Sequence, residues 1–134
     1  MLSTHLLRLT CRAVPARAHL SLSALKPAVY AIQSEEEFKS KVLGGSKPVV
    51  VDFSATWCGP CKMLTPRLEA AVAATEDAVD LAIVDIDDFS DLALEHDVSA
   101  VPTVIGVKNG AIVDRFVGLI DEDRLGSFIG KLKE

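Results

Sequence analysis

The sequence has no long hydrophobic run and only three cysteines. Its first 34 residues include no Asp or Glu. A membrane-spanning helix needs roughly 18 or more apolar residues without charge, and charged residues interrupt every hydrophobic stretch well before that length. Lys and Arg are scattered along the chain, whereas a nucleic acid requires a clustered positive face. Within these 134 residues we therefore expect one domain with an ordinary core plus an extension, with no membrane segment and no nucleic-acid partner.

The acid-free N-terminal segment is basic. Its charges are those of Arg8, Arg12, Arg17 and Lys26. The net charge of the chain is −5, so residues 35–134 carry −9. Hydroxyl residues recur in the segment, and a helix would align its leucines opposite its arginines, as is typical of a mitochondrial presequence. We predict a presequence over residues 1–27 and one domain over 28–134; a tail without a targeting role is the alternative.

Cysteine is scarce, and one of the three, Cys11, falls in the predicted presequence. Cys58 and Cys61 have C-x-x-C spacing, which occurs in redox sites, in zinc sites and by chance. Structural zinc takes four ligands, but beyond the presequence there is no second cysteine pair and a single histidine, His96. In a reducing compartment, a lone close pair is better explained as catalytic or metal-binding than as structural. The shortage of further zinc ligands then favours the catalytic reading.

Strand and helix patterns alternate after the presequence. An extended segment over 29–33 precedes Ser34-Glu35-Glu36-Glu37, whose capping-box form predicts a helix that ends at Gly44-Gly45. Later segments have the patterns of buried strands, of helices and of a hairpin with a type I′ turn at Asn109-Gly110. In chain order they are the strand 48–53, the helix 62–75, the strand 81–86, the helix 88–95, the hairpin 103–117 and a last helix capped by Asp121.

This β-α-β-α-β-α-β-β-α order predicts an α/β fold with a mixed central sheet and helices on both faces. Parallel crossovers come first, and the hairpin adds antiparallel strands last. Pro66 lies inside the helix 62–75, where it cannot donate the usual backbone hydrogen bond. We expect that helix to bend.

The segment Trp57-Cys58-Gly59-Pro60-Cys61-Lys62 connects a predicted strand to a predicted helix, which places both sulfurs at a helix N-terminus. Unpaired N–H groups and the positive end of the helix dipole stabilise an anion there, so Cys58 should ionise more readily than a free thiol. Its thiolate can attack a target disulfide, and Cys61 can then release the mixed disulfide.

One acid interrupts the buried strand, because Asp52 stands among Val49, Val50, Val51 and Phe53. Desolvation raises the pKa of such a carboxyl toward the range in which it exchanges protons near neutral pH. A satisfied polar group without a catalytic role is the alternative reading of Asp52.

Together these motifs resemble the thioredoxin family. The resemblance covers roughly residues 29–134 and, with the presequence, extends to the mitochondrial members. It rests on VDFSATWCGPCK at 51–62, Pro66, Val101-Pro102-Thr103, Lys108-Asn109-Gly110 and Gly118. It implies the thioredoxin fold, with Cys58 as nucleophile and Cys61 as resolving thiol. It further implies that Asp52 accepts a proton from Cys61 through water and that Pro102 is a cis-proline against the pair.

A docking surface for partner proteins around Cys58 is also implied by the resemblance. We expect a flat apolar rim there, since an exposed aromatic residue beside a reactive thiol suits transient recognition. Burial of Trp57 as core filler is the alternative. The predicted members of the rim are Trp57, Gly59, Pro60, Val101, Pro102, Gly118 and Leu119.

The activity implied by the resemblance is that of a protein disulfide reductase, which binds no cofactor and is regenerated by an NADPH-dependent thioredoxin reductase. The implied partners are that reductase, peroxiredoxins and other disulfide-containing proteins. The protein is expected to be a monomer and to be located in the mitochondrial matrix. An oxidase or isomerase would favour a histidine between the cysteines, where Pro60 stands. A redox-inert interaction module is the other alternative, and it would not need an intact dithiol with Asp52.

Two positions depart from the family pattern. Ile83 stands where many thioredoxins have a lysine near the buried acid, and Ser54 stands where bacterial members often have tryptophan. Without the neighbouring cation, Asp52 is expected to remain protonated to a higher pH than in relatives that have the lysine.

Overall fold

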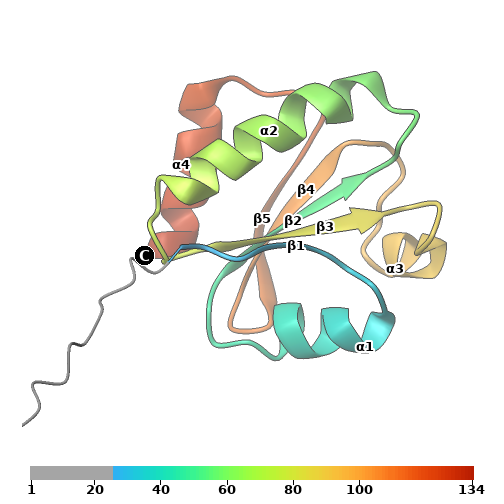
Figure 1. The fold of residues 1–134 in the computed structure, drawn as a ribbon, viewed down its shortest axis with the longest axis horizontal. Helices are drawn as coiled ribbons and strands as arrows, with labels where there is room; N and C mark the ends of the chain where they lie inside the picture. Colours follow the sequence, from blue (N-terminus) through green and yellow to red (C-terminus); the bar gives the residue numbers. More distant parts are fainter. Residues whose placement is uncertain (1–25) are drawn as a thin grey trace, which may run out of the picture.

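A computed structural model describes residues 26–134, so nearly all of the predicted presequence lies outside the described residues. Their centre is a five-stranded mixed sheet with strand order β1-β3-β2-β4-β5 (Figure 1). The strands are β1 (Val29–Ala31), β2 (Val49–Ser54), β3 (Asp80–Asp85), β4 (Thr103–Lys108) and β5 (Ala111–Val117). β1, β3 and β2 run parallel, and β4 and β5 pair antiparallel, as the predicted order requires.

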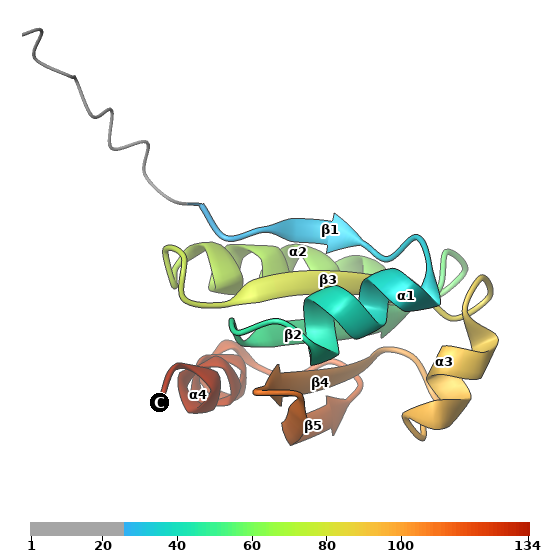
Figure 2. The same ribbon diagram turned by 90° about the horizontal axis from the view of Figure 1, so that it is seen from below.

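Helices cover both faces of the sheet, which confirms the predicted layering (Figures 1 and 2). The helix α2 (Gly59–Ala73) packs beside α4 (Glu122–Lys133) on one face. The opposite face is covered by α1 (Glu35–Glu37), its π-helical continuation η1 (Phe38–Leu43) and α3 (Ser90–Glu95). Two hydrophobic clusters, one on each face, therefore form the core.

The central strand β2 contributes to both clusters because successive side chains of a strand point to opposite faces. Val50 belongs to the cluster under α2 and α4, whereas Val49, Val51 and Phe53 belong to the cluster on the other face. Asp52 follows the alternation of Val50 and so faces α2. An acid is thereby placed on the same side of the sheet as the helix that begins after Cys58.

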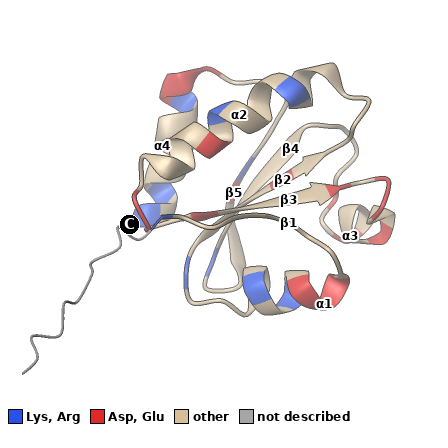
Figure 3. Ribbon diagram, viewed as in Figure 1, with Lys and Arg blue, Asp and Glu red and all other residues tan. Residues whose placement is uncertain are grey.

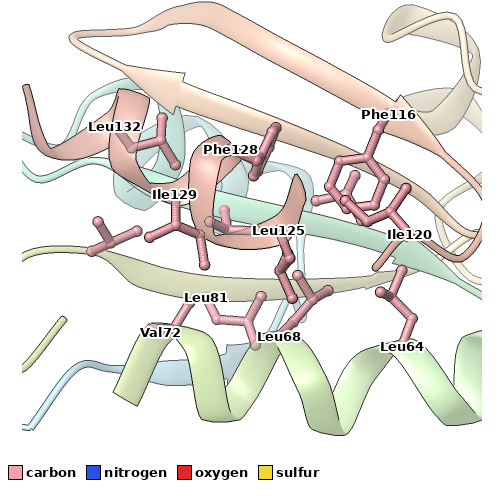
Figure 4. Packing of buried hydrophobic residues seen from close by; sticks show 13 residues of the cluster. Leu64, Leu68, Val72, Leu81, Phe116, Ile120, Leu125, Phe128, Ile129 and Leu132 are labelled. Atoms are coloured by element: carbon pink, nitrogen blue, oxygen red, sulfur yellow. The ribbon is translucent and has the colours of Figure 1, made fainter. Parts of the chain in front are cut away.

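Side chains of α2 and α4 interdigitate over that face (Figure 4). Leu64 and Leu68 on α2 are fully buried in the same cluster as Leu125 and Ile129 on α4. Burial of each such side chain stabilises the fold by about 1.5–3 kcal/mol. The packing holds the long helix α2 in one position over the sheet.

The predicted start signals are confirmed at both terminal helices. The Ser34 hydroxyl accepts from the Glu37 N–H at 3.1 Å, and the Asp121 carboxylate accepts from the Arg124 N–H at 2.8 Å. Glu37 reaches back one residue further than in a standard capping box, since its carboxylate accepts from the Gln33 N–H at 2.7 Å. Each cap satisfies backbone donors that the first helical turn leaves free.

Two details of the helices differ from simple expectation. The first helix is α-helical only over α1 and continues as the π-helix η1, where the Gly44 N–H bonds to the Lys39 carbonyl at 2.8 Å. This wider turn places Phe38 and Val42 together in the core. The second helix, α2, begins at Gly59 and continues through Pro66, so the turn that carries the cysteines is itself helical. The bend at Pro66 stays a prediction.

Charged residues of both signs lie on α1 with η1, on α2 and on α4 (Figure 3). The acids of α1 and α4 are in the first turn, and lysines follow toward the C-terminal end of each segment. Within residues 26–134, no helix combines the length and the apolar character needed to cross a bilayer.

Candidate active site

The two cysteines lie at the start of α2, directly after the loop that leaves β2. Cys58 is the N-cap residue and Cys61 lies in the first turn. Their Cα atoms are 5.3 Å apart, and their sulfurs are joined in a disulfide. Both side chains are nearly buried, with exposed fractions of 4% and 3%. The predicted pair is therefore assembled, and the structure holds it in the oxidised form.

The backbone around Cys58 favours negative charge on its sulfur. The Cys58 Sγ accepts a hydrogen bond from the Cys61 N–H at 3.2 Å, as an N-cap side chain does. Pro60 occupies the first turn, where its missing N–H removes no helical hydrogen bond. After reduction, a Cys58 thiolate would face this N–H group and the positive end of the α2 dipole, and both stabilise an anion.

Asp52 is fully buried beneath α2. Its Oδ2 accepts a hydrogen bond from the Thr65 hydroxyl at 2.7 Å, whereas its Oδ1 has no partner among the described residues. Burial raises the pKa of Asp52 to about 6; the Thr65 hydrogen bond opposes this shift and the charge of Glu69 adds to it. The predicted burial and the predicted direction of the pKa shift are both confirmed.

The neighbours of Asp52 on the adjacent strands carry no charge. Ile83 is its register partner on β3, and Val104 is its register partner on β4. Ile83 therefore does stand next to the buried acid, as the departure from the family pattern suggested. Neither strand supplies a cation that would favour the ionised carboxylate.

Trp57 is exposed beside the disulfide, with an exposed fraction of 66%, so its reading as core filler is wrong. Its indole Nε1 donates to the Asp87 carboxylate at 3.0 Å, which orients the ring at the surface. Gly59 and Pro60 are also exposed, and Leu119 has an exposed fraction of 41%. Apolar surface is therefore available next to Cys58.

The loop before β4 packs against the disulfide, and the loop after β5 is joined to it. Val101 is half-buried and packs against the cluster of Ala55, Cys58 and Cys61. The bond between Val101 and Pro102 is cis, as the resemblance implied. The Pro102 carbonyl accepts from the Gly118 N–H at 2.8 Å, so the loops before β4 and after β5 are joined. Pro102 itself is buried and Gly118 is half-buried, so the exposed surface here comes from their neighbours.

Comparison with known proteins agrees with this geometry. The sequence profile named thioredoxin matches residues 29–131. Mitochondrial thioredoxin of Bos taurus is 57% identical over 101 residues, which are 75% of this chain and 61% of that protein. A probable thioredoxin-2 of Caenorhabditis elegans is 45% identical over 102 residues, 76% of this chain and 70% of that protein. The chain belongs to the thioredoxin family.

A solved thioredoxin structure shows the same fold. The thioredoxin of Malassezia sympodialis superposes with a TM-score of 0.73 at 38% identity and covers 87% of this chain and 99% of its own. The predicted thioredoxin fold is thereby confirmed. The chain spans about 61% of the length of the mammalian mitochondrial thioredoxins that it matches.

A cavity of about 770 Å³ opens beside the thioredoxin dithiol. Cys61 and Thr65 of α2 form part of its wall, together with Ser54 and Ile83. The two positions that depart from the family pattern therefore line one cavity. Sequence reasoning missed Thr65, although its place one helical turn after Cys61 puts both residues on the same side of α2.

His96, the histidine weighed as a zinc ligand, lies away from the cysteines. Its ring packs against Phe38 at 5.2 Å and Phe53 at 6.0 Å between centroids, on the face opposite α2. Burial lowers the pKa of His96. Among residues 26–134, no group of three or more His, Cys, Asp or Glu side chains is placed to hold a metal ion.

Proposed function

We propose that this thioredoxin is a protein disulfide reductase in which Cys58 is the nucleophile and Cys61 the resolving thiol. The observation that carries the proposal is the disulfide between these two residues at the first turn of α2. A helix N-terminus is the backbone environment that favours a thiolate, and the thiolate is the attacking species in disulfide exchange.

The reaction proceeds in two exchanges. The Cys58 thiolate attacks one sulfur of a client disulfide, which forms a mixed disulfide and releases the other client sulfur as a thiolate. Cys61 then transfers its proton toward Asp52 through water and attacks the Cys58 sulfur. The client leaves with two thiolates; one takes up a proton from solvent, which received the Cys58 proton, and the other takes up the proton that Asp52 returns through water. The protein retains the Cys58–Cys61 disulfide that the structure holds. Two electrons pass to the client.

Asp52 serves as the proton acceptor in this scheme. A carboxyl with a pKa of about 6 is close to the pH at which it must both accept and return a proton. Its burial under α2, one layer below the dithiol helix, supports this role and argues against an inert strand residue.

Clients dock on the apolar rim around Cys58. An extended client segment would lie over the loop before Pro102 and against the exposed Trp57 ring. Weak redox encounters bury small interfaces, and the cores of interfaces are enriched in aromatic residues such as the exposed Trp57. The proposed docking residues are Trp57, Gly59, Pro60, Val101, Gly118 and Leu119. Pro102, also expected in the rim, is buried, and we propose that it shapes the loop beneath the client segment.

The cellular setting is proposed from the relatives. Three of them are named mitochondrial thioredoxins, which supports a mitochondrial location. In this proposal residues 1–27 are the presequence, residues 28–134 are the thioredoxin domain, and the matrix is the compartment. The monomeric protein binds no cofactor. A thioredoxin reductase returns it to the dithiol form with electrons from NADPH, and peroxiredoxins are among its clients.

Reduction of insulin disulfides tests the activity. The wild type should catalyse thiol-dependent reduction, and Cys58→Ser should abolish it. Cys61→Ser is the matched variant, because it retains the nucleophile and should accumulate a mixed disulfide with the client. A redox-inert interaction module would show no thiol-dependent turnover in the wild type. A disulfide oxidase would instead transfer its disulfide to reduced clients faster than it reduces oxidised ones.

A further inference from the structure

The Thr65 hydroxyl is the one hydrogen-bond partner of the Asp52 carboxyl within residues 26–134. Thr65 lies in α2 one turn after Cys61, and its side chain reaches down to β2. A hydrogen bond to an ionised carboxylate favours the charged form. Thr65 therefore acts directly on the group that is proposed to take the proton from Cys61.

Thr65 also stands between Asp52 and solvent. Asp52 has no exposed surface and does not line the cavity beside the dithiol, whereas Thr65 and Cys61 both do. A buried carboxyl exchanges protons only through groups that it contacts. The cavity is large enough to hold water, so a hydroxyl at its wall can bond to water on one side and to Asp52 on the other.

We propose that Thr65 is a positioning residue whose hydroxyl fixes Asp52 and passes protons between that carboxyl and water in the cavity beside Cys61. The inference rests on the proposed reductase function and names the route by which the resolving thiol loses its proton. No other side chain of the described residues joins Asp52 to this cavity by a hydrogen bond.

The proton transfer balances without a further reactant apart from water. The Cys61 thiol gives its proton to a water molecule in the cavity, and that water gives one of its own protons to the Thr65 oxygen. The Thr65 hydroxyl proton passes at the same time to Asp52 Oδ2. Cys61 becomes a thiolate, Asp52 becomes a neutral acid, and Thr65 and the water are unchanged. The reverse transfer restores the carboxylate.

None of the charged groups named for Asp52 favours its ionised form, so the Thr65 hydroxyl is the group that does. On α2 the Glu69 carboxylate disfavours the ionised Asp52, and the strand neighbours are Ile83 and Val104, which carry no charge. The other charged residues at the cavity are Lys62, Asp85 and Asp88. The Thr65 hydrogen bond is the interaction that lowers the pKa of Asp52 against burial.

Two substitutions at Thr65 separate the hydroxyl from the volume of the side chain. Thr65→Val keeps the branched shape and removes the hydroxyl, and Thr65→Ser keeps the hydroxyl. Thr75→Val is the control. Thr75 lies just after α2, and its hydroxyl donates to the Val72 carbonyl rather than to Asp52. Thermal unfolding of each variant shows that it is folded before it is assayed.

Two measurements are made on each variant. Carboxyl NMR titration of the reduced protein follows the pKa of Asp52, and stopped-flow release of a preformed mixed disulfide follows the resolving step as a function of pH. Thr65→Val should raise the pKa of Asp52 above that of the reduced wild type, because the variant lacks the hydrogen bond that opposes the effect of burial, and it should slow release by about tenfold at neutral pH. Thr65→Ser and Thr75→Val should behave as the wild type.

Either of two results overturns the inference. In the first, Thr65→Val has the same Asp52 pKa and the same release rate as the wild type. In the second, Thr65→Ser is impaired as much as Thr65→Val. Failure of the proposed function looks different. A wild type without thiol-dependent insulin reduction contradicts the reductase proposal, whereas the titration of Asp52 in Thr65→Val still decides whether the hydroxyl controls the carboxyl.

Discussion

Asp52 and Ile83 are register partners on β2 and β3, so an aliphatic side chain lies beside the buried acid on the face of the sheet that α2 covers. A lysine at this position, which the family pattern described above has in place of Ile83, would put a cation beside the carboxylate and stabilise it. Within residues 26–134, the Asp52 carboxyl accepts one hydrogen bond, and its donor is a neutral hydroxyl, that of Thr65.

Introduction of a cation at this position should reverse the effect. Ile83→Lys should lower the pKa of Asp52 below that of the wild type in the same redox state, because an opposite charge close to a carboxyl favours its ionised form. Carboxyl NMR titration of the reduced protein measures this shift. Ile83→Met is the control, since it has a similar volume and no charge. An Asp52 titration in Ile83→Lys that is not displaced downward would reject the electrostatic account.

The raised pKa of Asp52 makes stability depend on pH. The carboxyl titrates at about 6 in the folded protein and near 3.8 when unfolded. Ionisation therefore destabilises the fold progressively as pH rises from 3.8 to 6, and the full penalty, up to about 3 kcal/mol, applies above that range. Below pH 3.8 both states are protonated and the penalty is absent.

Asp52→Asn removes the ionisable group and keeps an acceptor for the Thr65 hydroxyl. The variant should be more stable than the wild type at pH 8 by as much as about 3 kcal/mol, and the difference should nearly vanish at pH 4. Urea unfolding of the oxidised proteins at both pH values measures this. Equal differences at pH 4 and pH 8 would show that the effect does not come from ionisation of Asp52.

Much of the fold was predictable because its signals are local. The caps at Ser34 and Asp121 and the turn at Asn109-Gly110 depend on residues within a few positions of one another. Asn109 and Gly110 indeed have φ angles of +54° and +78°, as a type I′ turn requires. The uninterrupted valine run of β2 likewise identified a strand buried on both faces.

Features that depend on packing between distant segments were not predictable. The π-helical turn of η1, in which Phe38 and Val42 are buried, has no signal in the local sequence. The link between Thr65 and Asp52 depends on how α2 lies across β2, and spacing alone does not specify that angle. Sequence reasoning could thus find the dithiol and the buried acid but not the hydroxyl between the acid and solvent.

Gly106 permits the close approach of α4 to β4. A Cβ atom at this position would lie 2.9 Å from Leu132 Cδ2 and 3.2 Å from Phe128 Cζ, both in buried side chains. Gly106→Ala should therefore destabilise the protein by about 1–3 kcal/mol in urea unfolding.

Gly126→Ala on the exposed side of α4 is the control, because a Cβ there meets no atom within 4 Å. That control should stabilise the helix by about 0.5–1 kcal/mol, and a Gly106→Ala variant as stable as the wild type would contradict the packing argument.

Removal of the exposed indole should separate client docking from thiol chemistry. Trp57→Ala leaves both cysteines in place but deletes the largest apolar group on the rim, so kcat/KM for insulin reduction should fall about tenfold. Reaction with a small aromatic disulfide should be nearly unchanged, since that substrate needs no extended contact.

Ile112→Ala is the control for this variant. Ile112 is also exposed, but it lies at the opposite end of the sheet from Cys58. Its register partner Val107 pairs with Val49 at the start of β2, whereas Cys58 follows the end of β2. This variant should reduce insulin at the wild-type rate. Equal losses toward insulin and the small disulfide in Trp57→Ala would mean that the indole acts on the thiolate itself. Retention of full activity toward insulin would remove Trp57 from the docking surface.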